Sequence, residues 1–382
     1  MQSIKQLFAK YGNFIFIIFM ILAFMIFGQS VLNSFIPNTA NWKTDFQIAT
    51  VPMDDFVSGG IDKDDIRPIN APLFVAASDI KDLKDRSPVL VVEVNGEKRA
   101  YPLMVLTRHE IVNDTIQDRA IAVTFCPLCN SGIVYNRTIE GQELQFGVSG
   151  NLRNNGLVMW DNHSESWWQQ FTGECLVGAY SGQKLEMIPS QIVGFGTLRQ
   201  HYPDTAVLVG DEMMPDMHYE QNYLDYGDSP SPLLFTGEVD QRLAENERIL
   251  AGWVGDTIRA YPFSSLQNKP LLQDQLGDKE VVIFWQAGAS SSYNLADIDE
   301  AQDIGMAAIF DRELADGRLL DFEWYYGKFM DKQTGSTWNI FGEATQGALK
   351  GQRLRPIHAS TYVWFAWSTF YPETDIYQAG DS

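Results

Sequence analysis

Cys126 and Cys129, in the stretch Cys-Pro-Leu-Cys, are the residues of this chain with the clearest chemical potential. Only three cysteines occur among 382 residues, and the spacing lets both sulfur atoms face one metal ion or each other. Such a pair serves as thiolate ligands of a metal, or as a dithiol that cycles with a disulfide. A third possibility is an inert pair, although the ring that a disulfide would close here is strained.

The sequence around the pair predicts a turn between two strands. Apolar residues lead into Cys126, and the Asn-Ser-Gly stretch 130–132 precedes a second strand that ends at Thr138. A redox dithiol of the thioredoxin type sits at a helix N-terminus, where the helix dipole lowers the thiol pKa. Here the pattern favours a metal-binding knuckle, in which backbone NH groups of the turn point at the sulfurs.

His109 is the first candidate for a third ligand, because zinc prefers four ligands and no second Cys-x-x-Cys is present. Glu110 and Asp114 would orient its second ring nitrogen or bind the metal; otherwise they are solvated helix charges. A Cys2His site with an open position suits catalytic zinc or a copper carrier. Three further candidates have ordinary alternative roles: Cys175 as a buried apolar residue, His163 in a turn and His358 at the surface.

Parts of the sequence recur in the same order, which predicts two homologous lobes at 87–210 and 247–378. The matched segments are 94–102 with 254–262, 121–125 with 281–285, 178–185 with 347–354, and 201–205 with 370–374. In this alignment Cys126-Pro-Leu-Cys129 matches Gln286-Ala-Gly-Ala289, and His109 matches Lys269. Because the second lobe would fold without them, the cysteines and the histidine are interpreted as a feature added to the first lobe.

Short apolar runs bounded by turn residues predict a β-rich α+β fold, without the strand–helix alternation of a parallel sheet. In the first lobe we expect strands at 89–94, 97–101, 120–125, 132–138, 144–149 and 156–160. Two helices are expected there, at 103–113 and 191–201. An extended lead-in, 33–86, and an acidic connection, 211–246, flank this lobe.

The chain has an unbroken apolar run from Phe14 to Phe27. With the residues that follow, the apolar segment covers 14–32, close to the ~20 residues that a membrane crossing needs. Lys5 and Lys10 lie in the preceding stretch, 1–13, which would stay in the cytoplasm and leave the bulk of the chain extracytoplasmic. We expect an uncleaved single-pass anchor in the cell membrane. A cleaved signal peptide, which would give a secreted protein, is the alternative.

The net charge of −21 argues against nucleic acid and anionic lipid headgroups as partners. Contact with a membrane is therefore expected through the N-terminal segment only. The partner is unknown, and a redox partner or a metal-delivery partner would fit the cysteine pair. Met213, Met214, Met217 and His218 form a second group of soft ligands that suits Cu(I), or else anchor an acidic linker.

These motifs resemble domain-of-unknown-function family 3179, bacterial and archaeal proteins that often carry an N-terminal signal or anchor. The resemblance covers about residues 55–378 and is carried by the segments 109–114, 124–129, 146–150, 178–185, 335–339 and 364–367. It implies no particular activity. The positions that it carries over are His109, Glu110, Asn113, Asp114, Cys126 and Cys129. Asn113 thereby joins Glu110 and Asp114 as a residue expected beside the site, whereas Cys175 and His163 fall outside the pattern.

The leading hypothesis is an exported, membrane-anchored protein whose first lobe binds zinc or copper through Cys126, Cys129 and His109. The alternative is an extracytoplasmic thiol–disulfide oxidoreductase that uses the same two cysteines. The third hypothesis is a non-catalytic binding or scaffold protein, in which the cysteines are incidental. The sequence leaves open whether the chain is an enzyme at all.

Overall fold

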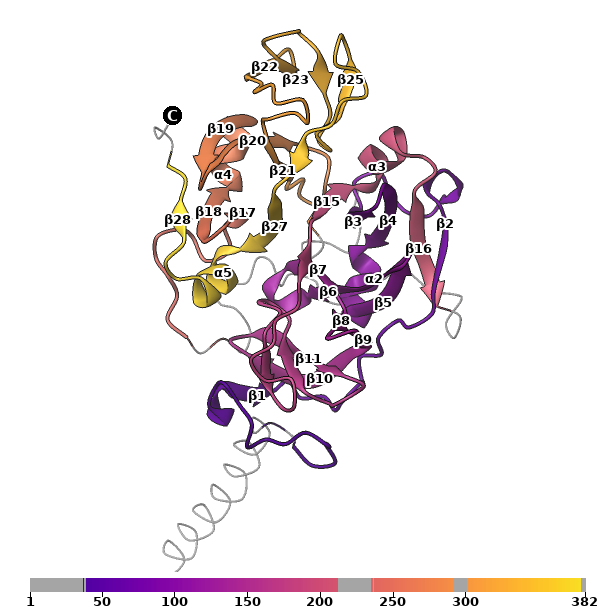
Figure 1. Cartoon of the computed structure of the whole chain (residues 1–382), viewed down its shortest axis with the longest axis vertical. Helices are drawn as coiled ribbons and strands as arrows, with labels where there is room; N and C mark the ends of the chain where they lie inside the picture. The colour runs from indigo at the N-terminus through magenta and orange to yellow at the C-terminus, as the bar shows by residue number, and fades with distance from the viewer. Residues whose placement is uncertain (1–36, 38, 212–234, 236, 292–300, 379–382) are drawn as a thin grey trace, which may run out of the picture.

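The computed structural model describes residues 37, 39–211, 235, 237–291 and 301–378. Strands dominate these ranges and form six sheets of four or five strands and one two-stranded ribbon (Figure 1). The prediction of a β-rich fold is thereby confirmed. None of the helices in these ranges has the length and apolar character to cross a membrane, and the predicted anchor, 14–32, lies outside them.

Two of the sheets share one strand order. The first contains β15 (Ser190–Gly194), β3 (Pro88–Val94), β4 (Glu97–Pro102), β16 (Ala206–Asp211) and β2 (Pro72–Ala76). The second contains β27 (His358–Val363), β17 (Arg248–Val254), β18 (Thr257–Pro262) and β28 (Asp375–Ile376). In both, the second strand of the hairpin pairs in parallel with a strand from the end of its half, β4 with β16 and β18 with β28. The predicted hairpins have equal register, because Val94 lies opposite Glu97 and Val254 opposite Thr257.

The second pair of sheets consists of one sheet in each half. In each half this sheet follows the hairpin after one short helix, α2 (Leu103–His109) or α4 (Phe263–Asn268). One sheet contains β14 (Met187–Ile188), β7 (Ser131–Asn136), β6 (Arg119–Cys126) and β5 (Ile111–Ile116). The other contains β26 (Arg355–Pro356), β21 (Met306–Asp311), β20 (Lys279–Gln286) and β19 (Leu271–Leu276). Both are antiparallel throughout.

A third pair of sheets completes the two halves. One contains β1 (Phe56–Ser58), β10 (Phe146–Arg153), β11 (Gly156–Asp161), β12 (Trp167–Gln169) and β13 (Cys175–Val177). The other contains β22 (Phe322–Tyr325), β23 (Lys328–Asp331), β24 (Thr337–Trp338) and β25 (Ala344–Gln346). The register shifts just before Trp168 in one sheet and just before Trp338 in the other. The remaining elements are the ribbon of β8 (Thr138–Ile139) and β9 (Gln142–Glu143), η1 (Met53–Asp55), η2 (Ala77–Asp79), η3 (Pro127–Cys129), α3 (Phe195–His201) and α5 (Trp364–Phe370).

The segment before the first hairpin lies along the first half. Its strand β1 pairs with β10, and its strand β2 pairs with β16. Trp42 and Phe46 pack edge-on against the buried Trp167, with ring centroids 5.3 and 5.2 Å apart. These contacts add edge strands and an aromatic cap to two sheets of the first half.

The two halves bury apolar side chains against each other, and β15 contacts β27 where they meet (Figure 1). Two core clusters mix residues of both halves, whereas two others lie within one half each. The contacts are reciprocal: Phe171 of the first half stacks on Phe370 of α5 at 4.5 Å, and Phe341 of the second half packs on Tyr202, next to α3, at 4.9 Å. Each half therefore supplies a helix end that the other half covers.

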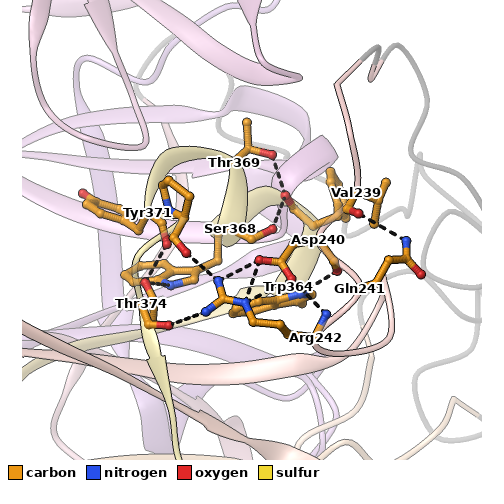
Figure 2. A network of polar contacts seen from close by, with 12 residues as sticks. Val239, Asp240, Gln241, Arg242, Trp364, Ser368, Thr369, Tyr371 and Thr374 are labelled. Atoms are coloured by element: carbon orange, nitrogen blue, oxygen red, sulfur yellow. Dashed lines mark hydrogen bonds and ion pairs between the residues drawn. The ribbon is translucent and has the colours of Figure 1, made fainter.

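Figure 2 shows how the chain that precedes β17 is fastened to α5. Arg242 forms an ion pair with Asp240 at 2.7 Å and donates hydrogen bonds to the carbonyl oxygens of Pro372 and Thr374. The indole NH of Trp364 donates to the carbonyl oxygen of Asp240 at 3.0 Å, and the guanidinium lies over the Trp364 ring. This network holds α5 against the chain that enters the second half.

Both predicted helices were placed too long. The first ends at His109, because Glu110 has a φ of 56° that no α-helix continues, and residues 111–116 form β5 instead. In the second, residues 190–194 pair with β3 as the strand β15, and only Phe195–His201 is helical. Pairing with a distant strand overrides the local preference in both places.

Replacement of Phe171 by alanine tests the reciprocal packing. The side chain is 1% exposed, so the cavity should lower the free energy of unfolding by about 3 kcal/mol, measured by urea denaturation. Phe341→Ala, at the half-buried counterpart, should cost less. Equal and negligible effects of both changes would contradict a core shared by the halves.

Candidate dithiol site

The cysteine pair lies in the turn that joins β6 to β7. Cys126 ends β6 opposite Ser131 of β7, and the 3-10 turn η3 carries Cys129. Asn130 closes the turn in the left-handed region, with φ 45° and ψ 44°, which asparagine tolerates well. The predicted position of the motif between two strands is confirmed. Both cysteines are buried, with 1% and 0% of their surface exposed, and no disulfide joins them in this structure.

Both sulfur atoms face the carbonyl oxygen of Asn155, with Sγ–O distances of 3.9 Å from Cys126 and 3.2 Å from Cys129. Asn155 lies in the turn of the β10–β11 hairpin, where Asn154 and Asn155 have φ values of 51° and 62°. Two adjacent residues with positive φ are typical of a tight hairpin turn, and asparagine is among the residues that accept it. This turn brings a hydrogen-bond acceptor to the two thiols.

The environment separates the two thiol pKa values. Burial raises the pKa of Cys126, but hydrogen bonds from the Cys129 thiol and from backbone NH groups of Leu157 and the turn outweigh burial and lower it. Burial, the hydrogen bond to Cys126 and the nearby charges of Cys126 and Glu110 raise the pKa of Cys129 well above its ordinary value. Cys126 is therefore the thiol that ionises first, and Cys129 is the one that keeps its proton.

Glu110 places a carboxyl group beside the pair. It is 6% exposed, and burial together with the charge of Cys126 raises its pKa well above the ordinary value. No hydrogen bond joins this carboxyl group to another residue in the described part of the chain. Its backbone carbonyl accepts from the NH of Phe125 at 2.8 Å, and the corresponding Pro270 accepts in the same way from Trp285. The fold thus uses the backbone at this position in both halves, while the carboxyl group is particular to the first.

Buried polar side chains continue from the turn into the core around Gln170, which is 0% exposed. Its amide group accepts from the hydroxyl of Ser131 at 3.1 Å and donates to the hydroxyl of Thr124 at 2.9 Å. Its backbone carbonyl accepts from Tyr135 at 2.6 Å. Because all these partners are fixed, the network sets the positions of the two strands that carry the cysteines.

The outer side of the turn borders a pocket of about 350 Å³. Leu128 and Asn130 contribute to its wall, and the second half supplies most of the rest, including Glu247, Gln267 and Asp303. The two cysteines are buried, whereas Leu128 of the same turn is partly exposed.

His109 points to another partner. Its Nδ1 donates a hydrogen bond to the carbonyl oxygen of Arg67 at 2.8 Å, and burial lowers its pKa. Among the described residues, no group of three or more His, Cys, Asp or Glu side chains is placed to hold a metal ion. The Cys2His set is therefore not assembled as placed, and zinc or copper binding by the pair stays a prediction. The predicted soft-ligand group of Met213, Met214, Met217 and His218 lies outside the described residues.

Asp114 and Asn113 have structural partners that recur in the second half. Asp114 accepts from Arg99 at 2.6 Å and from Tyr101 at 2.6 Å. The corresponding Asp274 accepts from Arg259 and Tyr261 at 2.7 and 2.9 Å, in a half that has no cysteines. Asn113 likewise binds the backbone NH of Phe146 at 2.9 Å, and its counterpart Gln273 binds that of Phe322 at 2.8 Å.

The other three candidates make contacts of their own. Cys175 is buried in β13, where burial raises its pKa to about 12. His163 accepts or donates a hydrogen bond at 2.9 Å with Tyr180, in an exposed turn. His358 contacts Met187 between the halves.

Asn155 and Gln170 are absent from the sequence-based predictions. The backbone carbonyl of Asn155 contacts Cys129, which is 26 residues away in the sequence. The side-chain amide of Gln170 contacts Ser131, which is 39 residues away. The double asparagine of the hairpin turn is a local signal, but it predicts a turn and not the residue that the turn faces.

The fold and the site define a β-rich protein of two similar halves with a buried thiol pair in one of them. The chain belongs to the family described as Protein of unknown function (DUF3179), whose profile matches residues 63–374. Family membership confirms the resemblance seen in the motifs. Comparisons with curated proteins and with solved structures gave no significant match.

Asp114→Asn and Asp274→Asn form a matched pair that separates structure from chemistry. Each removes one carboxylate from a largely buried arginine, which keeps its second partner, Glu97 or Asp375, so each should lower the free energy of unfolding by about 1–3 kcal/mol. Alkylation of the thiols by iodoacetamide at native conditions should proceed at the same rate in both variants. A rate change with Asp114→Asn alone would make Asp114 part of the thiol site.

Glu110→Gln tests the raised pKa. A carboxyl group with a raised folded-state pKa holds its proton longer in the folded chain, so folding stability falls as pH rises above 4.5 through that pKa. Between pH 4.5 and 7 the wild type should lose stability relative to Glu110→Gln, by up to about 1.4 kcal/mol per pH unit. The check is urea denaturation of both proteins across this range; parallel curves would show that the carboxyl titrates normally.

Proposed function

We propose that Cys126 and Cys129 form a redox-active dithiol that exchanges with disulfides. The observation that carries this proposal is the convergence of both thiols on one carbonyl oxygen beside the buried carboxyl group of Glu110. A dithiol oxidoreductase needs a nucleophilic thiolate, a second thiol within reach and a group that takes the second proton. The three residues match these roles.

In this proposal the Cys126 thiolate attacks one sulfur of a partner disulfide, forms a mixed disulfide and releases one partner thiolate. Glu110 gives its proton to the released partner thiolate and, as a carboxylate, then takes the proton of Cys129. The Cys129 sulfur attacks the Cys126 sulfur, which closes the disulfide and releases the second partner thiolate. The two thiol protons leave for the two partner sulfurs, so two thiols and one disulfide become one disulfide and two thiols.

The burial of the pair limits what can react. The cysteines are buried and Leu128 and Asn130 of their turn line the neighbouring pocket, so we expect a partner disulfide to enter through that pocket while the turn 127–130 moves aside. A disulfide in a narrow loop, or a small cyclic disulfide, fits this entrance better than a flat protein surface. With the segment 14–32 as an anchor, the exchange would take place on the outer side of the cell membrane.

Zinc or copper on the same thiolates is the second candidate function. It is favoured by the backbone NH groups that point at the Cys126 sulfur, as in metal-binding knuckles. Cys126 and Cys129 would hold the ion, and the remaining ligands, such as His109, would have to move toward the pair. Bound metal would supply Lewis acidity or a transferable cargo.

The two halves are proposed to descend from an internal duplication. Three pairs of sheets with matching strand order support this, as do the hairpin registers and the repeated Asp–Arg–Tyr contacts. In this view the dithiol arose in one copy, and the second copy shows what the fold needs without it.

The decisive experiment combines thiol, disulfide and metal measurements on the full-length chain purified without chelator. With oxidised dithiothreitol or glutathione, the wild type should lose two thiols, and Cys129→Ser should accumulate a mixed disulfide at Cys126 that mass spectrometry detects. Cys175→Ser is the matched control and should behave as the wild type, because that thiol lies in another sheet. Glu110→Gln should slow closure of the disulfide and leave formation of the mixed disulfide unchanged.

Two results would count against the dithiol. One equivalent of zinc or copper that disappears in Cys126→Ser would support the metal site instead. Thiols that stay reduced and metal-free under all these conditions would indicate an incidental pair in a binding or scaffold protein.

A further inference from the structure

A pocket of about 440 Å³ lies between the halves, away from the cysteine turn. Met187 of β14 and His358 of β27 meet in it, with 3.2 Å between the thioether sulfur and Nε2. The indole ring of Trp253 stands edge-on to the imidazole, with ring centroids 5.0 Å apart. A soft sulfur, an imidazole nitrogen and an aromatic ring thus share one half-buried space.

The protonation of His358 decides what this contact can be. Burial lowers its pKa to about 4, so the ring is neutral near pH 7 and one nitrogen carries a lone pair. If Nε2 holds the hydrogen, the contact is an N–H···S hydrogen bond. If Nδ1 holds it, Nε2 has a free lone pair near the sulfur, and a cation beside the two atoms, off the line that joins them, would contact both.

The same fold builds a second pocket, of about 330 Å³, without these residues. The internal alignment matches Met187 with Pro356, His358 with Pro189 and Trp253 with Glu93, and all three counterparts line the second pocket. Tyr202 and Tyr371 are likewise equivalent, one in each pocket. The fold therefore requires none of the three side chains, and their combination in one pocket calls for another explanation.

We propose that Met187 and His358 bind a soft monovalent cation, Cu(I) in the cell, with the Trp253 ring beside the ion. Thioether and imidazole are ligands that suit Cu(I), and Trp253 places an aromatic ring next to both. With bonds of about 2.0 Å to nitrogen and 2.3 Å to sulfur, the 3.2 Å separation gives an angle near ~95° at the ion. This leaves coordination positions open toward the pocket, as a site that accepts and releases its ion requires.

The charged side chains that line the pocket, Asp256 and Lys184, offset each other, so the local charge does not oppose a cation. The chain as a whole carries a net charge of −21, which favours the approach of cations. This site shares no residue with the dithiol, so its test does not depend on the outcome of the redox proposal.

Silver(I) is the probe, because it resembles Cu(I) and does not change oxidation state in air. The test uses the full-length chain with Cys126→Ser, Cys129→Ser and Cys175→Ser, so that no thiol competes. Titration calorimetry should show about one equivalent of silver that is lost in both Met187→Leu and His358→Gln. Pro356→Leu, the equivalent change in the second pocket, is the matched control and should leave that equivalent in place.

Two further measurements do not depend on those variants. Trp253→Phe should bind silver but lose the change in tryptophan fluorescence that accompanies binding. X-ray absorption of the thiol-free chain loaded with Cu(I) should show one sulfur and one imidazole ligand.

Silver binding that survives in Met187→Leu would place the ion elsewhere, for instance on the Met213–His218 segment, and would overturn the proposal. If the chain binds no silver, the proposal is wrong, and the contact between His358 and Met187 is an N–H···S hydrogen bond.

Discussion

The mutual burial of apolar sheet faces between the two halves is the constraint on which the rest of this structure depends. Two of the core clusters draw on residues of both halves, so neither half covers its own apolar surface alone. Reciprocal ring packing at Phe171 and Phe341 sets how the halves meet. A hydrogen bond from Ser360 to the carbonyl oxygen of Gly132 then joins the second half to the strand that follows the cysteines. The environment of the thiols is therefore made by both halves.

That burial also creates the electrostatics of the site. Cys126, Cys129 and Glu110 occupy a region with little solvent, where the cost of ionisation is high and one group's charge shifts the pKa of the next. Backbone NH groups of the turn favour ionisation of Cys126, and nothing comparable favours Cys129 or Glu110. The proton therefore stays on Cys129 and Glu110 more readily than on Cys126.

Comparison of the two halves separates residues that the fold needs from residues that it does not. The contacts of Asp114 recur at Asp274, so Asp114 is explained by structure alone. Glu110 keeps only its backbone contact in the other half, and the side-chain difference singles it out. The same comparison distinguishes the two pockets between the halves, of which one carries a histidine and a methionine in contact.

The sequence by itself determined the local features. Alternating apolar runs and Asn-Gly or Gly-Asp turns predict the hairpins, and the Cys-Pro-Leu-Cys stretch predicts a turn between strands, because both signals act within a few residues. Only the tertiary structure decided that α2 ends at His109, that His109 turns to Arg67, and that Asn155 faces the sulfurs. These outcomes depend on contacts between segments far apart in the chain, where the free energy of pairing and burial exceeds any local preference.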